Sequence, residues 1–169
     1  MTPSSTANGQ HLAPIVMKMP RATPLQATCT ACSRQKLRLK LQPAATTVES
    51  IVVAADVGCI NNKLIVDGQI YGGVAQGVGL ALSEDYEDIK NHSTLAGAGF
   101  PYIKQIPDNL EIMYIETPRE RGPFGAAGTG ELPLSAPHAA IINAIYNACG
   151  ARVRDLPARP EKVLAAMPK

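Results

Sequence analysis

The pattern of apolar and polar positions predicts regular secondary structure mainly after residue 45. Residues 48–56 are largely β-branched or small and apolar, which predicts a buried strand that leaves through a turn at 56–58. Residues 64–68 predict a short strand or extended piece that ends in an Asp-Gly turn. Residues 111–116 alternate polar and apolar positions, which predicts a strand with one face in water.

The apolar spacing next predicts a helix over residues 69–89, with Ile70, Val74 and Val78 on one face. This helix contains glycines at 72, 73, 77 and 79. Each glycine costs about 1 kcal/mol relative to alanine inside a helix, so the cluster requires a structural reason. Glycine permits the close approach of another backbone or of a bulky ligand, and the pattern leaves both open.

A second main helix is predicted over residues 139–148, which are strongly amphipathic. Ser135 is expected to be its N-cap, Pro137 lies in its first turn, and Gly150 ends it. A short helix follows from Pro160. The expected fold class is therefore α+β, with short strands and two main helices.

The composition supports a packed core and excludes several classes of function. Hydrophobic residues make up 46% of the 169 residues and charged residues 18%. Aromatic residues are only 4%, with no Trp, so stacking surfaces for nucleic acid are poorly supplied. No apolar run is long enough to span a bilayer. We therefore expect neither a nucleic-acid partner nor a membrane partner.

The charge divides the chain into two parts. The first 48 residues hold six basic and no acidic side chains, which leaves 16 − 6 = 10 basic and 14 acidic residues, a net of −4, for the remainder. We therefore expect residues 1–45 to be an irregular basic segment, in which 36–41 alternates like a strand, and 46–169 to be the folded part. An organelle-targeting segment also fits the basic start.

The cysteines and histidines provide little evidence for a metal site. Cys29 and Cys32 have ligand spacing, but no second pair is placed to complete a tetrahedral site. Cys59 and Cys149 are single and are expected to be small buried side chains, as in a reduced, cytoplasmic protein. The three histidines do not pair, and His138, in the first turn of a helix, is expected to be structural.

The densest candidate for chemistry is the glycine-rich stretch from Gly122 to Pro133, which contains a single carboxylate, Glu131. Glycines allow a chain to direct its amide groups toward an anion. A carboxylate held dry among apolar residues suits a general base, and the alternative is a glycine-rich turn with a solvated glutamate. The nicotinamide-binding fingerprint is absent here, because Pro133 stands where its third glycine should be. The acidic run at 83–88 is expected to be a solvated helix end.

Four segments together carry a resemblance to a known family: Asp56–Gly58, Ile60–Gly77, Gly122–Glu131 and Pro137–Ile145. They resemble the C-terminal part of the molybdenum-binding region of the xanthine dehydrogenase/aldehyde oxidase family. The likeness is greatest to bacterial aldehyde oxidoreductases that carry molybdopterin cytosine dinucleotide, and it covers about residues 46–167. The resemblance implies a partial molybdenum-cofactor-binding domain.

The resemblance also implies roles for individual residues. Glu131 matches the active-site glutamate of the family, a general base that takes a proton from water or hydroxide at the metal, whose oxygen is transferred to an aldehyde. Gly73, Gln76 and Gly77 match the segment that lines the pterin cofactor. The loop is expected to supply backbone donors near the metal from Gly125, Ala126, Ala127, Gly128, Thr129 and Gly130.

The family's two iron–sulfur (2Fe-2S) clusters belong to N-terminal domains that this sequence does not contain. The resemblance therefore implies the rest of a molybdenum hydroxylase polypeptide as partner and an aldehyde as substrate, and it leaves a homodimer open. We expect the chain to be inactive by itself. The alternative is a non-catalytic remnant or association module that lacks the cofactor.

Residues 1–45 lie outside the resemblance. With suitable codons, reading 27–36 in another frame restores a segment close to that of the family. An out-of-frame reading and a segment without a fixed fold both stay open as explanations.

Overall fold

The computed structural model describes residues 38–42, 45–88 and 90–168. Most of the basic N-terminal segment, including Cys29, Cys32 and His11, lies outside this part of the chain. The described elements are, in order, β1 (Arg38–Gln42), β2 (Ala45–Asp56), α1 (Lys63–Leu82), η1 (Ile103–Gln105), β3 (Asn109–Ile115), η2 (Pro123–Gly125), η3 (Leu132–Leu134), α2 (Pro137–Cys149) and α3 (Pro160–Ala165).

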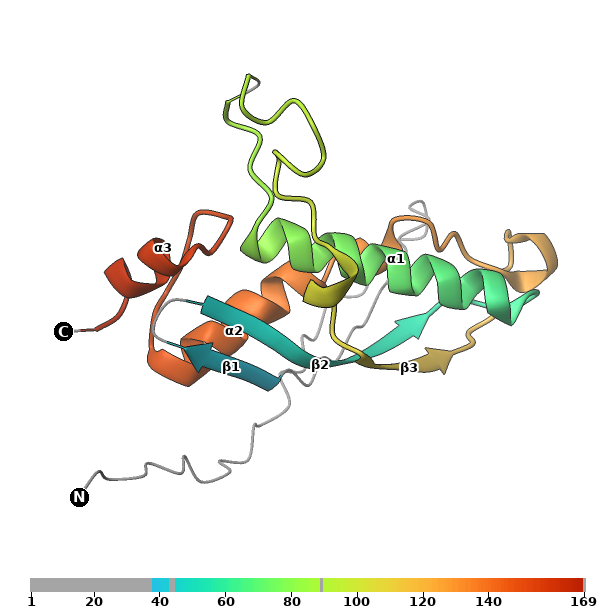
Figure 1. The fold of residues 1–169 in the computed structure, drawn as a ribbon. Coiled ribbons are helices and arrows are strands. Elements are labelled where there is room, and N and C mark those ends of the chain that lie inside the picture. Colours follow the sequence, from blue (N-terminus) through green and yellow to red (C-terminus); the bar gives the residue numbers. More distant parts are fainter. Residues whose placement is uncertain (1–37, 43–44, 89, 169) are drawn as a thin grey trace.

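The sheet has the order β1-β2-β3, with β2 as its central strand (Figure 1). β1 pairs antiparallel with the first half of β2, and β3 pairs parallel with the second half, from Ser50↔Asn109 to Asp56↔Ile115. The β1 register shifts at the end of the ladder, where Arg38 pairs with Ser50 and Leu39 with Val48. This irregularity lies between the buried residues Val48 and Ile51, whose spacing breaks the period of two expected along a strand.

The predicted strands at 48–56 and 111–116 are confirmed as β2 and β3. Along β2 the buried residues Ile51, Val53 and Ala55 alternate with half-buried ones. They join residues of α1 and α2 in one hydrophobic core, which includes Ile70, Val74, Ile141 and Ile145. Burying an aliphatic side chain of this size contributes about 1.5–3 kcal/mol, so these contacts hold the helices to the sheet.

The helix α1 begins six residues earlier than the sequence predicts, so the short strand expected at 64–68 is wrong. The side chain of Asn62 accepts a hydrogen bond from the N–H of Ile65 and caps the helix. Lys63 and Asp67 form an i,i+4 ion pair of 2.8 Å in the first turns. These local contacts, together with the Tyr114 hydroxyl that donates to Asp67, outweigh the low helix propensity of the segment.

The same helix ends earlier than predicted, at Leu82 rather than near 89. The N–H groups of Ser83 and Glu84 both bond to the carbonyl of Gly79, which turns the chain out of the helix. The following segment projects from the body of the molecule (Figure 1). Glu84 is only 6% exposed, so the expectation of a wholly solvated acidic run is wrong at this residue.

The helix α2 confirms the second predicted helix, and Gly150 ends it in the left-handed conformation with φ 74°. Its N-cap differs from the prediction. Ser135 belongs to the preceding 3₁₀ turn, where its hydroxyl donates to the carbonyl of Leu132, and Ala136 occupies the N-cap position. The predicted third helix is confirmed as α3. No helix in the described ranges is long and apolar enough to cross a membrane.

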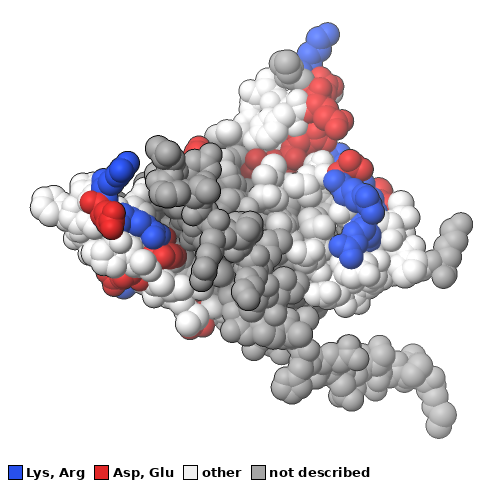
Figure 2. Space-filling model, turned by 180° about the vertical axis from the view of Figure 1, so that it is seen from behind, with Lys and Arg blue, Asp and Glu red and all other residues white. Residues whose placement is uncertain are grey.

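Charged side chains occupy limited areas of the surface. Figure 2 shows acidic groups gathered on the projecting segment after α1. Several exposed side chains are large and apolar, with Leu64 81%, Ile103 83% and Phe124 89% exposed.

Candidate functional site

The glycine-rich loop is attached to the end of β2 by backbone hydrogen bonds. Gly58 pairs with Ala126 in an isolated antiparallel bridge, and the N–H of Ala127 donates to the carbonyl of Val57 over 2.9 Å. The carbonyl of Gly125 accepts from the N–H groups of both Cys59 and Arg119. The contact requires glycine at 58, because a Cβ there would lie 2.5 Å from the Gly125 carbonyl oxygen.

The side chain of Asp56 fixes the same attachment of the glycine-rich loop to the end of β2. Its Oδ1 accepts hydrogen bonds from the N–H groups of Gly58 and Thr117, each 3.2 Å long, and its Oδ2 lies 3.2 Å from the guanidinium of Arg119. Burial raises the pKa of Asp56, but the hydrogen bonds and Arg119 outweigh it, so the net shift of the pKa is downward from 3.8. The ionised form of Asp56 therefore stabilises the base of the loop.

The two halves of the predicted donor segment differ. The N–H groups of Gly125, Ala126 and Ala127 donate to carbonyls within this chain, so they serve the structure of the loop. By contrast, the N–H groups of Thr129, Gly130 and Glu131 have no hydrogen-bond partner in the part of the chain that the structure describes. A Cβ at Gly130 would meet no atom of the described residues within 4 Å, so these residues leave space beside this amide.

Glu131 carries the last of these amides and precedes η3, whose Leu134 N–H bonds to the Glu131 carbonyl. Its side chain is exposed, so the chain supplies the position of the carboxylate but does not itself bury it. The dry surroundings that would suit a general base are absent from the described residues. An exposed carboxylate can accept a proton, and amides without partners among the described residues can donate hydrogen bonds to an anion.

The glycines of α1 are explained mainly by close packing within this chain. A Cβ at Gly73 would lie 2.7 Å from the Cβ of Pro133, and one at Gly77 would lie 2.7 Å from the Cβ of Pro137. Both glycines are buried, and they allow η3 and the start of α2 to approach the helix. The sequence left open whether these glycines allow the approach of another backbone or of a bulky ligand. The structure shows the approach of another part of this chain.

Gln76 is exposed and lies between these two contacts along α1. Because residues three and four apart share a helix face, Gln76 lies beside the ridge that touches η3. The contact of η3 with Gly73 thus brings the regions of Gln76 and Glu131 to one junction. The structure therefore assembles the two segments that the sequence singled out.

Among the remaining candidates, His138 contacts η3 and Cys59 contacts the glycine-rich loop. His138 contacts the carbonyl of Leu134 through Nδ1, in agreement with a structural role. His92 lies in the segment after α1, and Cys59 and Cys149 are half-buried free thiols. Among the described residues no group of three or more His, Cys, Asp or Glu side chains could hold a metal ion.

The sequence analysis missed the contribution of Asp56 and Arg119, although Asp56 stands directly before the Val-Gly turn. It also missed Phe124, which is 89% exposed and has a left-handed backbone with φ 53°. This conformation is rare for an aromatic residue and costs about 1–2 kcal/mol. The hydrogen bonds of Gly125 and Ala126 around it keep the loop in this shape.

A sequence model of the molybdopterin cofactor-binding domain matches residues 3–107. The matched range includes most of the basic N-terminal segment that the resemblance left out. The chain is 66% identical over 122 residues to the aldehyde oxidoreductase of Megalodesulfovibrio gigas. It is 40% identical over 126 residues to the nicotine 6-hydroxylase large subunit of Paenarthrobacter nicotinovorans.

The fold agrees with these sequence matches. The crystal structure of the aldehyde oxidoreductase from Desulfovibrio desulfuricans superposes on 75% of the chain with a TM-score of 0.72 and 74% sequence identity. The M. gigas match covers 72% of this chain but only 14% of the relative, and the nicotine 6-hydroxylase match covers 70% and 15%. The chain thus spans about one seventh of the length of the relatives it matches.

Proposed function

The chain belongs to the molybdopterin cofactor-binding domain family, and on this premise we propose that it forms the base-carrying part of a molybdenum hydroxylase. The proposed reaction is the oxidation of an aldehyde to a carboxylic acid, with water as the source of the added oxygen. The observation that carries the proposal is the exposed Glu131 carboxylate together with the amides of Thr129, Gly130 and Glu131, which have no partner among the described residues.

These residues fit an anionic cofactor. Three consecutive N–H groups lack hydrogen-bond partners among the described residues and can serve as donors to an anion, and the missing side chain at Gly130 leaves room beside them. We propose that these amides hold molybdopterin cytosine dinucleotide or the oxygen atoms at its metal. When bound, the cofactor supplies the two-electron redox chemistry of the reaction.

The proposed role of Glu131 is that of a general base. Its carboxylate takes a proton from the attacking water or hydroxide, and the oxygen thereby becomes a better nucleophile toward the aldehyde carbon. The Asp56–Arg119 ion pair and the bridge between Gly58 and Ala126 hold the beginning of the loop. The packing of η3 on Gly73 holds its end, so the carboxylate is positioned from both sides.

The rest of a larger polypeptide is the proposed partner. It would supply the iron–sulfur clusters, the remaining walls of the substrate pocket and the burial that Glu131 lacks here. The exposed side chains Leu64, Ile103 and Phe124 support this part of the proposal, because each would bury apolar area against a partner. They equally favour the alternative, an association module without cofactor, which the following experiment separates.

The test is a chimaera in which residues 46–167 replace the matching stretch of the M. gigas aldehyde oxidoreductase. We expect the chimaera to contain molybdenum and to oxidise aldehydes. E131Q should keep the molybdenum content and lower kcat about 10²–10⁴-fold, the usual contribution of a general base. E120Q is the matched control, because Glu120 is an exposed carboxylate of the same connection.

Two results would reject the proposal. A chimaera that folds without molybdenum would favour the association module. An E131Q variant with the turnover of the E120Q control would show that Glu131 is not the base.

A further inference from the structure

The first half of β2 has one unpaired edge. β1 occupies one side of the strand along Ala45–Ser50, whereas β3, on the other side, begins only opposite Ser50. The chain that enters β3 carries Pro107, which has no N–H to continue the ladder, and η1 comes before it. Backbone groups of residues 46–49 on this side therefore have no strand partner among the described residues.

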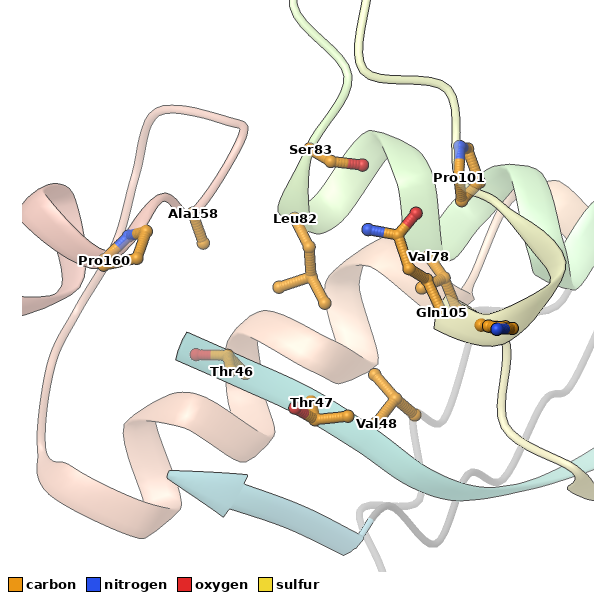
Figure 3. A pocket seen from close by; sticks show the side chains of 11 residues that line it. Thr46, Thr47, Val48, Val78, Leu82, Ser83, Pro101, Gln105, Ala158 and Pro160 are labelled. Atoms are coloured by element: carbon orange, nitrogen blue, oxygen red, sulfur yellow. The ribbon is translucent and has the colours of Figure 1, made fainter. Parts of the chain in front are cut away.

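A pocket of about 420 Å³ lies along this edge (Figure 3). Thr46, Thr47 and Val48 all contribute to its wall. Successive side chains of a strand point to opposite faces, so a pocket lined by three in a row runs along the edge of the strand rather than over one face. The opposite wall comes from Val78 and Leu82 of α1.

We propose that an extended peptide segment adds to this edge of β2 as a further strand. The segment belongs to the part of the relatives' polypeptide that this chain does not cover. The match covers 14% of the M. gigas protein, so this part makes up the other 86%. The inference rests on the proposed function, since it takes the partner to be the rest of a molybdenum hydroxylase.

The pocket defines the chemistry of the added segment. The N–H and C=O groups of residues 46–49 that have no strand partner among the described residues provide ladder hydrogen bonds for about two alternate residues. Val78 and Leu82 favour a small apolar side chain that points toward α1. Lys104 of η1 also lines the pocket and favours an acidic side chain on the segment. Such pairing also covers an edge that would otherwise be a template for aggregation.

The experiment compares amide hydrogen exchange in the full 169-residue chain and in the chimaera described above. The amides of residues 46–49 that face the free edge should exchange about 100-fold more slowly in the chimaera. T47W should remove this protection, because the indole would fill the pocket beside the edge. E49W is the matched control, since Glu49 is an exposed residue of the same strand that does not line the pocket.

Equal exchange in the chain and the chimaera, fast or slow, would overturn the proposal. Equal effects of T47W and E49W would overturn it as well and would leave the pocket to a small molecule. A second measurement does not require a folded chimaera: the chain is co-expressed with the M. gigas polypeptide that lacks the matched stretch. T47W should lower the co-purified amount at least about ten-fold relative to E49W, and equal amounts would contradict the inference.

These readouts separate the two proposals. Exchange and co-purification do not depend on aldehyde turnover, so an inactive chimaera with protected edge amides would reject the function and retain the added strand. An active chimaera with unprotected edge amides would retain the proposed function and reject the added strand.

Discussion

Adding a methyl group to neighbouring glycines of α1 separates helix propensity from packing. Gly72 and Gly73 both lie in the interior of the helix, but a Cβ at Gly72 would meet no atom of the described part of the chain within 4 Å. A Cβ at Gly73 would lie 2.7 Å from the Cβ of Pro133 and 3.1 Å from the amide nitrogen of Leu134. Contacts this short require η3 or the helix to move.

The expected magnitudes follow from this geometry. Alanine gains about 0.5–1 kcal/mol over glycine in a helix, so G72A should stabilise the protein by that amount. G73A receives the same gain, but overpacking a buried contact costs about 1–3 kcal/mol. Because the propensity gain is shared, the difference between the two variants measures the overpacking alone, about 1–3 kcal/mol.

The assay is urea unfolding of the wild-type chain, G72A and G73A, with the midpoint and the slope compared. Heat unfolding is an independent check, in which each kcal/mol shifts Tm by about 2–4 °C for a protein of this size. If G73A were as stable as G72A, the close contact between α1 and η3 would be refuted. The link between α1 and the position of Glu131 would then lose its basis.

Two further predictions concern the base of the loop. D56N should cost about 1–3 kcal/mol of unfolding free energy at pH 7, because it removes a charge that accepts two backbone hydrogen bonds and pairs with Arg119. The folded-state pKa of Asp56 lies below 3.8, so its stabilisation is present above that pH and is lost as the pH falls through the folded-state pKa. Urea unfolding at pH 7 and near pH 3 should therefore show the difference from wild type shrinking in acid, and a constant difference would contradict the assignment. F124G should stabilise the isolated chain by about 1 kcal/mol, because glycine adopts φ 53° without strain, whereas F124A should not. Thermal unfolding checks this pair, and equal effects of the two substitutions would argue against backbone strain at Phe124.

The parts of the fold that sequence predicts well are those with long apolar patterns. β2 and α2 bury residues at the periods of a strand and a helix, and both are found close to where the pattern places them. The start of α1 was missed because its determinants lie outside any periodicity. The cap by Asn62 and the hydrogen bond between Asp67 and Tyr114, 47 residues away, decide the conformation there.

In the candidate site, too, the sequence predicts the local features but not those that depend on distant contacts. The sequence identifies Glu131 and the glycine-rich loop, since both stand out locally. It does not show that the N–H groups of 125–127 are used within the chain while those of 129–131 are free, because this depends on a bridge to Gly58. Nor does it show the partners of Asp56, of which Thr117 is 61 residues away.

Position and burial are separate requirements for a general base, and the described residues meet only the first. Asp56, Gly58 and Gly73 fix both ends of the loop, so Glu131 has a defined place even without a neighbouring domain. Its exposure means that water screens the carboxylate, which weakens its coupling to any nearby charge. A second polypeptide that covers Glu131 itself would exclude that water while leaving the loop unchanged. The chain is therefore organised so that docking, rather than a rearrangement of its own backbone, would complete the proposed site.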